Sequence, residues 1–72
     1  MTDSGSITVR INGKDRELPA GLSVTATLEH LDLNPALVVV ELNREILERA
    51  LYADVEVKSG DVLELVHFVG GG

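Results

Sequence analysis

Segments with the pattern of β-strands stand near both ends of the chain, and a single segment between them has the pattern of a helix. Residues 6–11 alternate strictly between polar and apolar side chains, as a half-buried strand does. Residues 62–68 are apolar except for Glu64 and His67, and they indicate a second strand. Because one helix must cover the whole sheet, this order favours a layer of strands with a helix across one face.

The first strand continues into a hairpin. Asn12-Gly13 is a strong hairpin signal, because both residues tolerate a positive φ. Residues 14–18 then return antiparallel to residues 6–11. Their charged side chains suit an edge strand, where they discourage pairing with another sheet.

The predicted helix follows this hairpin. Ser23 is a suitable N-cap, and Asn34-Pro35 cannot continue a helix, so we expect it to stop at Leu31 or Asp32. The apolar face at helical spacing consists of Val24, Thr27, Leu28 and Leu31. The positions expected to face solvent are Thr25, Glu29 and His30.

The second half of the chain is expected to complete the sheet. Residues 37–42 are rich in β-branched side chains and indicate a strand, and residues 46–47 indicate a short return strand. Residues 48–57 have no clear pattern, although Leu51-Tyr52 fits a turn of helix. Residues 58–61 indicate a tight turn before the last strand.

These elements predict an α+β fold with a mixed sheet of four to five strands and one main helix across one face. The first and last strands are expected to lie side by side and parallel in the middle, because the intervening chain is long enough for a crossover. This is the β-grasp, or ubiquitin-like, arrangement; another small α+β roll is the alternative. We expect a single domain over residues 1–72, with a flexible leader at 1–5 and a flexible tail at 70–72.

The last strand is expected to present different side chains to its two sides. If Leu63 and Leu65 point toward the helix, then Glu64, Val66 and Phe68 point outward. Exposed apolar side chains beside the tail predict a docking surface that includes Val66 and Phe68. The alternative is that Phe68 folds back onto the margin of the sheet.

Composition excludes several classes of function. With twelve acidic and six basic residues, the formal charge is −6, which disfavours binding to nucleic acid. No apolar run approaches a membrane span, no signal peptide is recognisable, and the cytoplasm is the expected compartment. There is no cysteine, and His30 and His67 lack metal-ligand spacing. Since no catalytic motif or cofactor loop is present, we expect a protein that is not itself an enzyme.

Three consecutive glycines, Gly70, Gly71 and Gly72, follow the last strand. Glycine has no side chain and samples φ of either sign, so such a tail is sterically open. A carboxylate on Gly72 could enter the narrow active site of another protein, with Gly70 and Gly71 in contact with that partner. The alternative is a frayed terminus without function.

Four features in order resemble the ThiS family, the sulfur carriers of thiamin biosynthesis. They are Ile11-Asn12-Gly13, Gly21-Leu22-Ser23-Val24 with Leu28-Glu29-His30-Leu31, Val40-Glu41-Leu42-Asn43-Arg44-Glu45-Ile46, and Ser59-Gly60-Asp61-Val62-Leu63-Glu64-Leu65-Val66 running into His67-Phe68-Val69-Gly70-Gly71-Gly72. The last feature is the most specific, because many β-grasp proteins share the first three loosely.

The resemblance implies a defined chemistry at Gly72. A ThiF-like adenylyltransferase of the ubiquitin-activating type uses ATP to adenylate the terminal carboxylate. Sulfur from a cysteine desulfurase system then displaces the adenylate and leaves a thiocarboxylate, from which a ThiG-like thiazole synthase takes sulfur into the thiazole ring. The carrier binds no cofactor of its own.

Other carriers with the same fold and tail remain open at this point. The small subunit of molybdopterin synthase looks similar but often has prolines before the terminal glycines, where this chain has Phe68-Val69. Related proteins donate sulfur to tRNA or become conjugated to lysines. An interaction module with an incidental glycine end is the remaining class.

Overall fold

The structure, a computed structural model, describes residues 5–68 and contains a five-stranded sheet in the order β2-β1-β5-β3-β4. The strands are β1 (Ser6–Ile11), β2 (Lys14–Pro19), β3 (Val38–Leu42), β4 (Glu45–Leu47) and β5 (Val62–His67). The helical elements are α1 (Val24–His30) and two 3₁₀ turns, η1 (Pro35–Leu37) and η2 (Arg49–Leu51). These elements match the predicted order of strands and helix.

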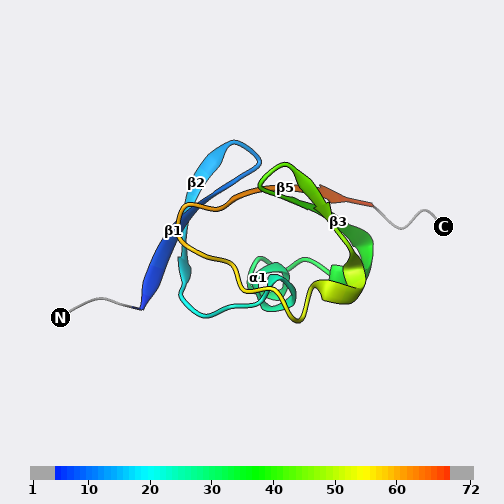
Figure 1. Ribbon diagram of the computed structural model, residues 1–72, viewed down its shortest axis with the longest axis horizontal. Helices are drawn as coiled ribbons and strands as arrows, with labels where there is room; N and C mark the ends of the chain where they lie inside the picture. The colour runs from blue at the N-terminus through cyan, green and yellow to red at the C-terminus, as the bar shows by residue number, and fades with distance from the viewer. Residues whose placement is uncertain (1–4, 69–72) are drawn as a thin grey trace.

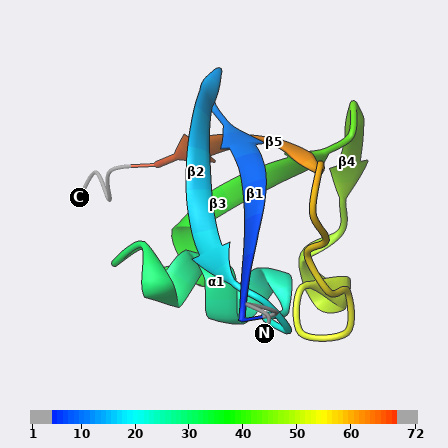
Figure 2. The same cartoon turned by 90° about the vertical axis from the view of Figure 1, so that its left-hand side faces the viewer.

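The first and last strands lie side by side and parallel, as predicted. Arg10 pairs with Val62 and Ile11 with Leu63, and β3 pairs antiparallel with the other edge of β5. Strand β5 therefore occupies the centre of the sheet, and β2 and β4 form its edges. Helix α1 lies against one face of this sheet (Figures 1 and 2). Because the sheet is twisted, β1 and β2 run at a steep angle to β3 (Figure 2). This arrangement confirms the β-grasp prediction.

Helix α1 begins and ends close to the predicted positions. The Ser23 hydroxyl accepts a hydrogen bond from the Ala26 N–H at 3.0 Å, as an N-cap does. The helix ends at His30, and Asp32 follows in the left-handed region with φ of 63°. The prediction that Thr25 faces solvent was wrong: Thr25 is half-buried, because its N–H donates to the Tyr52 carbonyl at 3.0 Å and brings the later loop against the helix.

The segment without a clear pattern, residues 48–57, closes one edge of β3. Strand β4 pairs with β3 only as far as Leu47, opposite Val40. Beyond that point the buried Tyr52 hydroxyl donates to the Val38 carbonyl at 2.8 Å and accepts from the Val40 N–H at 3.1 Å. The predicted helical turn near Leu51-Tyr52 is present, but it is the 3₁₀ turn η2 and begins at Arg49. Tyr52 thus supplies the hydrogen bonds that a longer β4 would have made.

The core between α1 and the sheet is aliphatic apart from Tyr52. Its buried apolar members are Val9, Ile11, Leu18, Val24, Leu28, Val38, Val40, Tyr52, Val57 and Leu63. One polar side chain, Thr27, is also fully buried, and within residues 5–68 its hydroxyl has no hydrogen-bond partner. The core therefore depends on shape and burial, with one unsatisfied polar group.

Several boundaries differ slightly from those expected, and among them β2 ends at Pro19 and β4 begins at Glu45. Leu37 closes η1 instead of starting β3, because Pro35 and the Asn34 side chain, which accepts from the Ala36 N–H at 2.9 Å, favour a 3₁₀ turn there. Strand β5 ends at His67 instead of Phe68. The predicted tail at 70–72 and all of the predicted leader except Gly5 lie outside the described residues.

Candidate functional site

The end of β5 divides its side chains between the two faces of the sheet, as predicted. Leu63 is fully buried and Leu65 half-buried under the sheet, whereas Val66 and Phe68 are 53% and 54% exposed. The Phe68 N–H donates to the Leu37 carbonyl at 2.8 Å, so the backbone continues the ladder with the β3 side. Phe68 is therefore more than half exposed and lies outside the buried core. Gly70, Gly71 and Gly72 lie outside the described residues.

We use the term outer face for the side of the sheet opposite α1, which no helix covers within residues 5–68 (Figure 1). Val39 lies opposite Val66 on this face, and Ile46, which is 67% exposed, lies opposite Glu41. Val66 and Phe68 were predicted to be exposed, and Ile46 was not. Side chains alternate between the two faces along β4, so the register of β4 against β3 would have placed Ile46 on the outer face.

Two asparagines hold β5 from its two sides. The Asn12 side chain donates to the Leu65 carbonyl at 3.2 Å and accepts from the Leu65 N–H at 2.7 Å. On the β3 side, the Asn43 side chain accepts from the Val62 N–H at 2.9 Å, and the Asn43 backbone N–H donates to the Val62 carbonyl at 2.8 Å. Each asparagine follows a strand that flanks β5.

Both asparagines have a left-handed backbone, with φ of 52° at Asn12 and 51° at Asn43. Asparagine tolerates this region better than most residues, and its amide can both donate and accept. The same residue type therefore turns the chain and bonds the central strand. Asn12-Gly13 was predicted to form a hairpin turn, but the bonds of Asn12 to β5 were not predicted, because the partner, Leu65, is 53 residues away.

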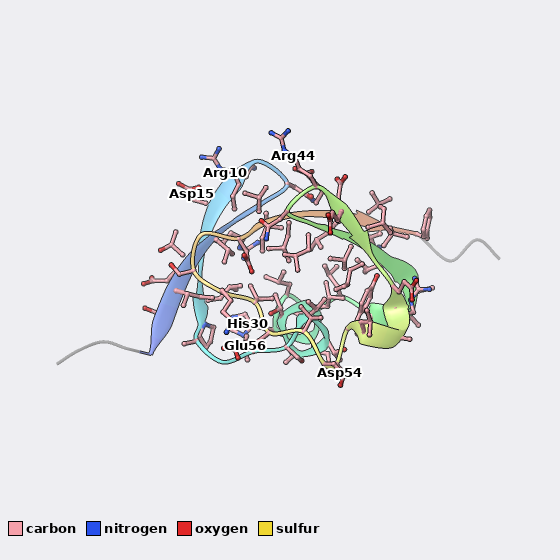
Figure 3. All side chains as sticks on the ribbon, in the orientation of Figure 1. Arg10, Asp15, His30, Arg44, Asp54 and Glu56 are labelled. Carbon is pink, nitrogen blue, oxygen red and sulfur yellow. The ribbon has the colours of Figure 1, made fainter. Side chains whose placement is uncertain are left out.

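The outer face carries two carboxylates directly opposite one another. Glu41 and Glu64 are cross-strand partners in the β3–β5 ladder, with Glu41 half-buried and Glu64 exposed. The salt bridges found within residues 5–68 join Arg10 to Asp15 at 3.1 Å and Lys58 to Glu56 at 3.7 Å. Neither includes the facing glutamates. Figure 3 shows Arg10 beside Asp15 and Arg44 pointing away from the sheet.

The other candidate groups do not assemble into a site. His30 and His67 are both exposed, and they lie on different elements, α1 and β5. Within residues 5–68, no three His, Cys, Asp or Glu side chains are grouped so that they could hold a metal ion. In the same part of the chain, no helix has the length and hydropathy needed to cross a membrane. The end of β5 remains the candidate site.

A family model described as the ThiS family matches residues 9–72, which include the second half of β1, the other strands of the sheet, α1 and the three glycines. The match therefore extends from the first strand through the candidate site to Gly72.

Similar proteins fall into two groups. The sulfur carrier protein ThiS of Bacillus subtilis is 40% identical over 68 residues, covering 89% of this chain and 98% of that protein. A thiazole synthase of Paramagnetospirillum magneticum is 45% identical over 62 residues, covering 86% of this chain. This chain spans only 19% of that enzyme and 20% of a second thiazole synthase, from Magnetococcus marinus.

The fold has a close counterpart among solved structures. The crystal structure of the thiamine biosynthesis protein ThiS from Geobacter metallireducens superposes with a TM-score of 0.77 at 38% identity. The superposition covers 92% of this chain and 100% of that one. The arrangement of strands and helix described above is thus shared along nearly the whole chain.

Proposed function

This chain belongs to the ThiS family of sulfur carriers of thiamin biosynthesis, and on that premise we propose that the carboxylate of Gly72 is the group that carries the sulfur. In this proposal the carboxylate becomes a thiocarboxylate and delivers its sulfur for thiazole formation. The chain itself performs no catalysis and acts in the cytoplasm as a co-substrate of partner enzymes.

The observation that carries the proposal is the match of the ThiS family model through Gly72. The geometry of β5 supports it. Leu63 is fully buried and fixes the strand in the core, whereas Val66 and Phe68 are about half exposed on the side that α1 does not cover. A partner can therefore contact the strand immediately before the glycines without displacing any element of residues 5–68.

The proposed first step is activation of the carboxylate. A carboxylate is a poor electrophile, because its charge is spread over two oxygens. A ThiF-like adenylyltransferase transfers AMP from ATP to a carboxylate oxygen of Gly72, and pyrophosphate leaves. The resulting mixed anhydride has a good leaving group, and the absence of a Cβ on glycine lets a nucleophile approach the acyl carbon.

The proposed second step introduces sulfur. The terminal sulfur of a persulfide, supplied by a cysteine desulfurase system, attacks the acyl carbon and displaces AMP, which gives an acyl disulfide. A second thiol reduces that disulfide, releasing the thiocarboxylate and forming a new disulfide on the donor side. A ThiG-like thiazole synthase then takes the sulfur. This chain has no cysteine, so it contributes no thiol to these steps.

Intact mass spectrometry tests the proposal. The chain is co-expressed with an adenylyltransferase of the ThiF type and a cysteine desulfurase, and its mass is compared with that of the chain expressed alone. We expect the mass increase that accompanies replacement of one oxygen by sulfur, with the change located in the C-terminal peptide. An unchanged mass in the presence of both active enzymes would contradict the proposal.

Two tail variants provide the control. Deletion of Gly72, or addition of one alanine after it, is expected to abolish the mass change while leaving the thermal unfolding curve unaltered. A large drop in the melting temperature of either variant would show that the tail belongs to the fold. Modification that persists in the variant lacking Gly72 would place the sulfur elsewhere.

A further inference from the structure

The outer face combines apolar exposure with unbalanced negative charge. Val66 and Phe68 keep about half of their surface in solvent, and Ile46 keeps two-thirds. Glu41 and Glu64 face each other across β3 and β5. Ile46 of β4 is the neighbour of Glu41 across the sheet, and the Val39–Val66 pair lies two residues further along the same two strands. The carboxylates of Glu41 and Glu64 therefore have the apolar residues Ile46, Val39 and Val66 as neighbours.

Because Glu41 and Glu64 are direct cross-strand partners, we expect their like charges to lower the stability of the fold. In an antiparallel ladder every second residue pair is joined by backbone hydrogen bonds. The pairs Asn43–Val62 and Leu37–Phe68 are joined in this way, and Glu41–Glu64 lies two residues from the first and four from the second, so it is also a hydrogen-bonded pair. Side chains at such a position are direct neighbours, and like charges there repel. Arg10, on the neighbouring strand β1, forms its ion pair with Asp15 at 3.1 Å.

The charge restricts what covers this face. A second copy of the chain, placed face to face, would bring four carboxylates together, and a nucleic-acid backbone would add phosphates. A surface with a guanidinium or ammonium group would instead relieve the repulsion on binding. Apolar side chains around that group would cover Val66, Phe68 and Ile46.

We propose that the outer face docks a thiazole synthase through Val66 and Phe68, and that an arginine or lysine of that enzyme lies between the carboxylates of Glu41 and Glu64. The choice of enzyme rests on the proposed function and on the 45% identity between this chain and a segment of a thiazole synthase. The glutamate pair is then a specificity determinant that selects a basic partner surface and rejects an acidic one.

The test compares glutamine variants in two measurements. Glu41→Gln, Glu64→Gln and the double variant are titrated into a purified thiazole synthase by isothermal calorimetry, and their thermal unfolding is recorded separately. The double variant is expected to bind about tenfold more weakly or worse, because the partner's cation loses its counter-charge. Its melting temperature is expected to rise, because the repulsion is gone.

Salt dependence and a matched variant complete the design. Added salt should weaken binding of the unaltered chain and have much less effect on the double variant. Glu29→Gln removes the same charge from an exposed position on α1, away from the outer face, and is expected to bind like the unaltered chain.

The outcomes separate this inference from the proposed function. If the double variant binds as tightly as the unaltered chain, or melts at a lower temperature, the role of the glutamates is wrong while the carrier function stands. If the unaltered chain acquires the thiocarboxylate but does not bind the enzyme, the assigned partner is wrong. If it neither binds nor acquires sulfur, both proposals fail.

Discussion

On the helix side of the sheet, Leu63, Val38 and Val40 have no solvent-exposed surface, whereas on the outer face Val66 and Phe68 keep 53% and 54% of theirs. The same two strands, β3 and β5, supply both sets of side chains. A strand directs alternate residues to opposite faces, so a few residues of β5 meet two different requirements. The inner residues hold the strand in the fold, and the outer residues are available to a partner.

The difference between the two faces shows how a carrier of this size separates stability from recognition. Burial of the inner side chains fixes the position of β5, and the side chains of Asn12 and Asn43 fix its register. On the outer face, Val66 and Phe68 keep about half of their surface in solvent, and two carboxylates stand opposite one another. Substitutions on the two faces should therefore affect different measurements.

The largest expected effect on stability comes from the inner face. Leu63→Ala removes a fully buried side chain from the centre of the core and should lower the free energy of unfolding by about 2–5 kcal/mol. Urea denaturation followed by circular dichroism measures this change. A loss no larger than that of an exposed-site variant would mean that β5 is not anchored as described.

Tyr52→Phe tests the closure of β3 and should have the next largest effect. The substitution removes the hydroxyl that bonds Val38 and Val40, and leaves the Val40 N–H buried without that partner. The free energy of unfolding should fall by about 1–3 kcal/mol. Hydrogen exchange should show faster exchange at the Val40 amide, and unchanged protection there would contradict the assigned bond.

Thr27→Val should act in the opposite direction and by less. The Thr27 hydroxyl is fully buried and without a partner within residues 5–68, and valine has nearly the same shape. Removing an unsatisfied polar group should raise the free energy of unfolding by about 1 kcal/mol. Thr27→Ser is the matched control, because it keeps the hydroxyl, removes a buried methyl and should be destabilising.

Phe68→Asp should have the smallest effect on stability and a large effect on binding. Phe68 is 54% exposed, outside the core, so the free energy of unfolding should change by less than about 0.5 kcal/mol. Affinity for a thiazole synthase should fall strongly, because a charge would replace an apolar contact. A stability loss comparable to that of Leu63→Ala would place Phe68 in the core.

Short-range signals were sufficient to predict most of the fold. Asn12-Gly13, the Ser23 cap and the alternation of residues 6–11 each act within a few residues, so the hairpin, α1 and β1 were predicted near their actual bounds. The parallel neighbours β1 and β5 followed from strand order and the need for a long crossover. The inward and outward residues of β5 followed from alternation.

Interactions between distant residues leave no local pattern in the sequence. The bonds of Tyr52 to β3 and of Asn12 to Leu65 join parts of the chain that become neighbours only after folding. The facing of Glu41 and Glu64 depends on the register of β3 against β5, which the sequence pattern does not determine to a single residue. Thr25 was misplaced because the loop that covers it has no clear pattern.

The most direct test of the contrast between the two faces is methyl NMR of the isotope-labelled chain during titration with a thiazole synthase. The methyl signals of Ile46 and Val66 should shift or broaden, since both side chains lie on the outer face. The methyl signals of Val24, Val57 and Leu63, which are buried under the sheet, should remain in place. Perturbation of the buried methyls with Ile46 and Val66 unaffected would contradict the account.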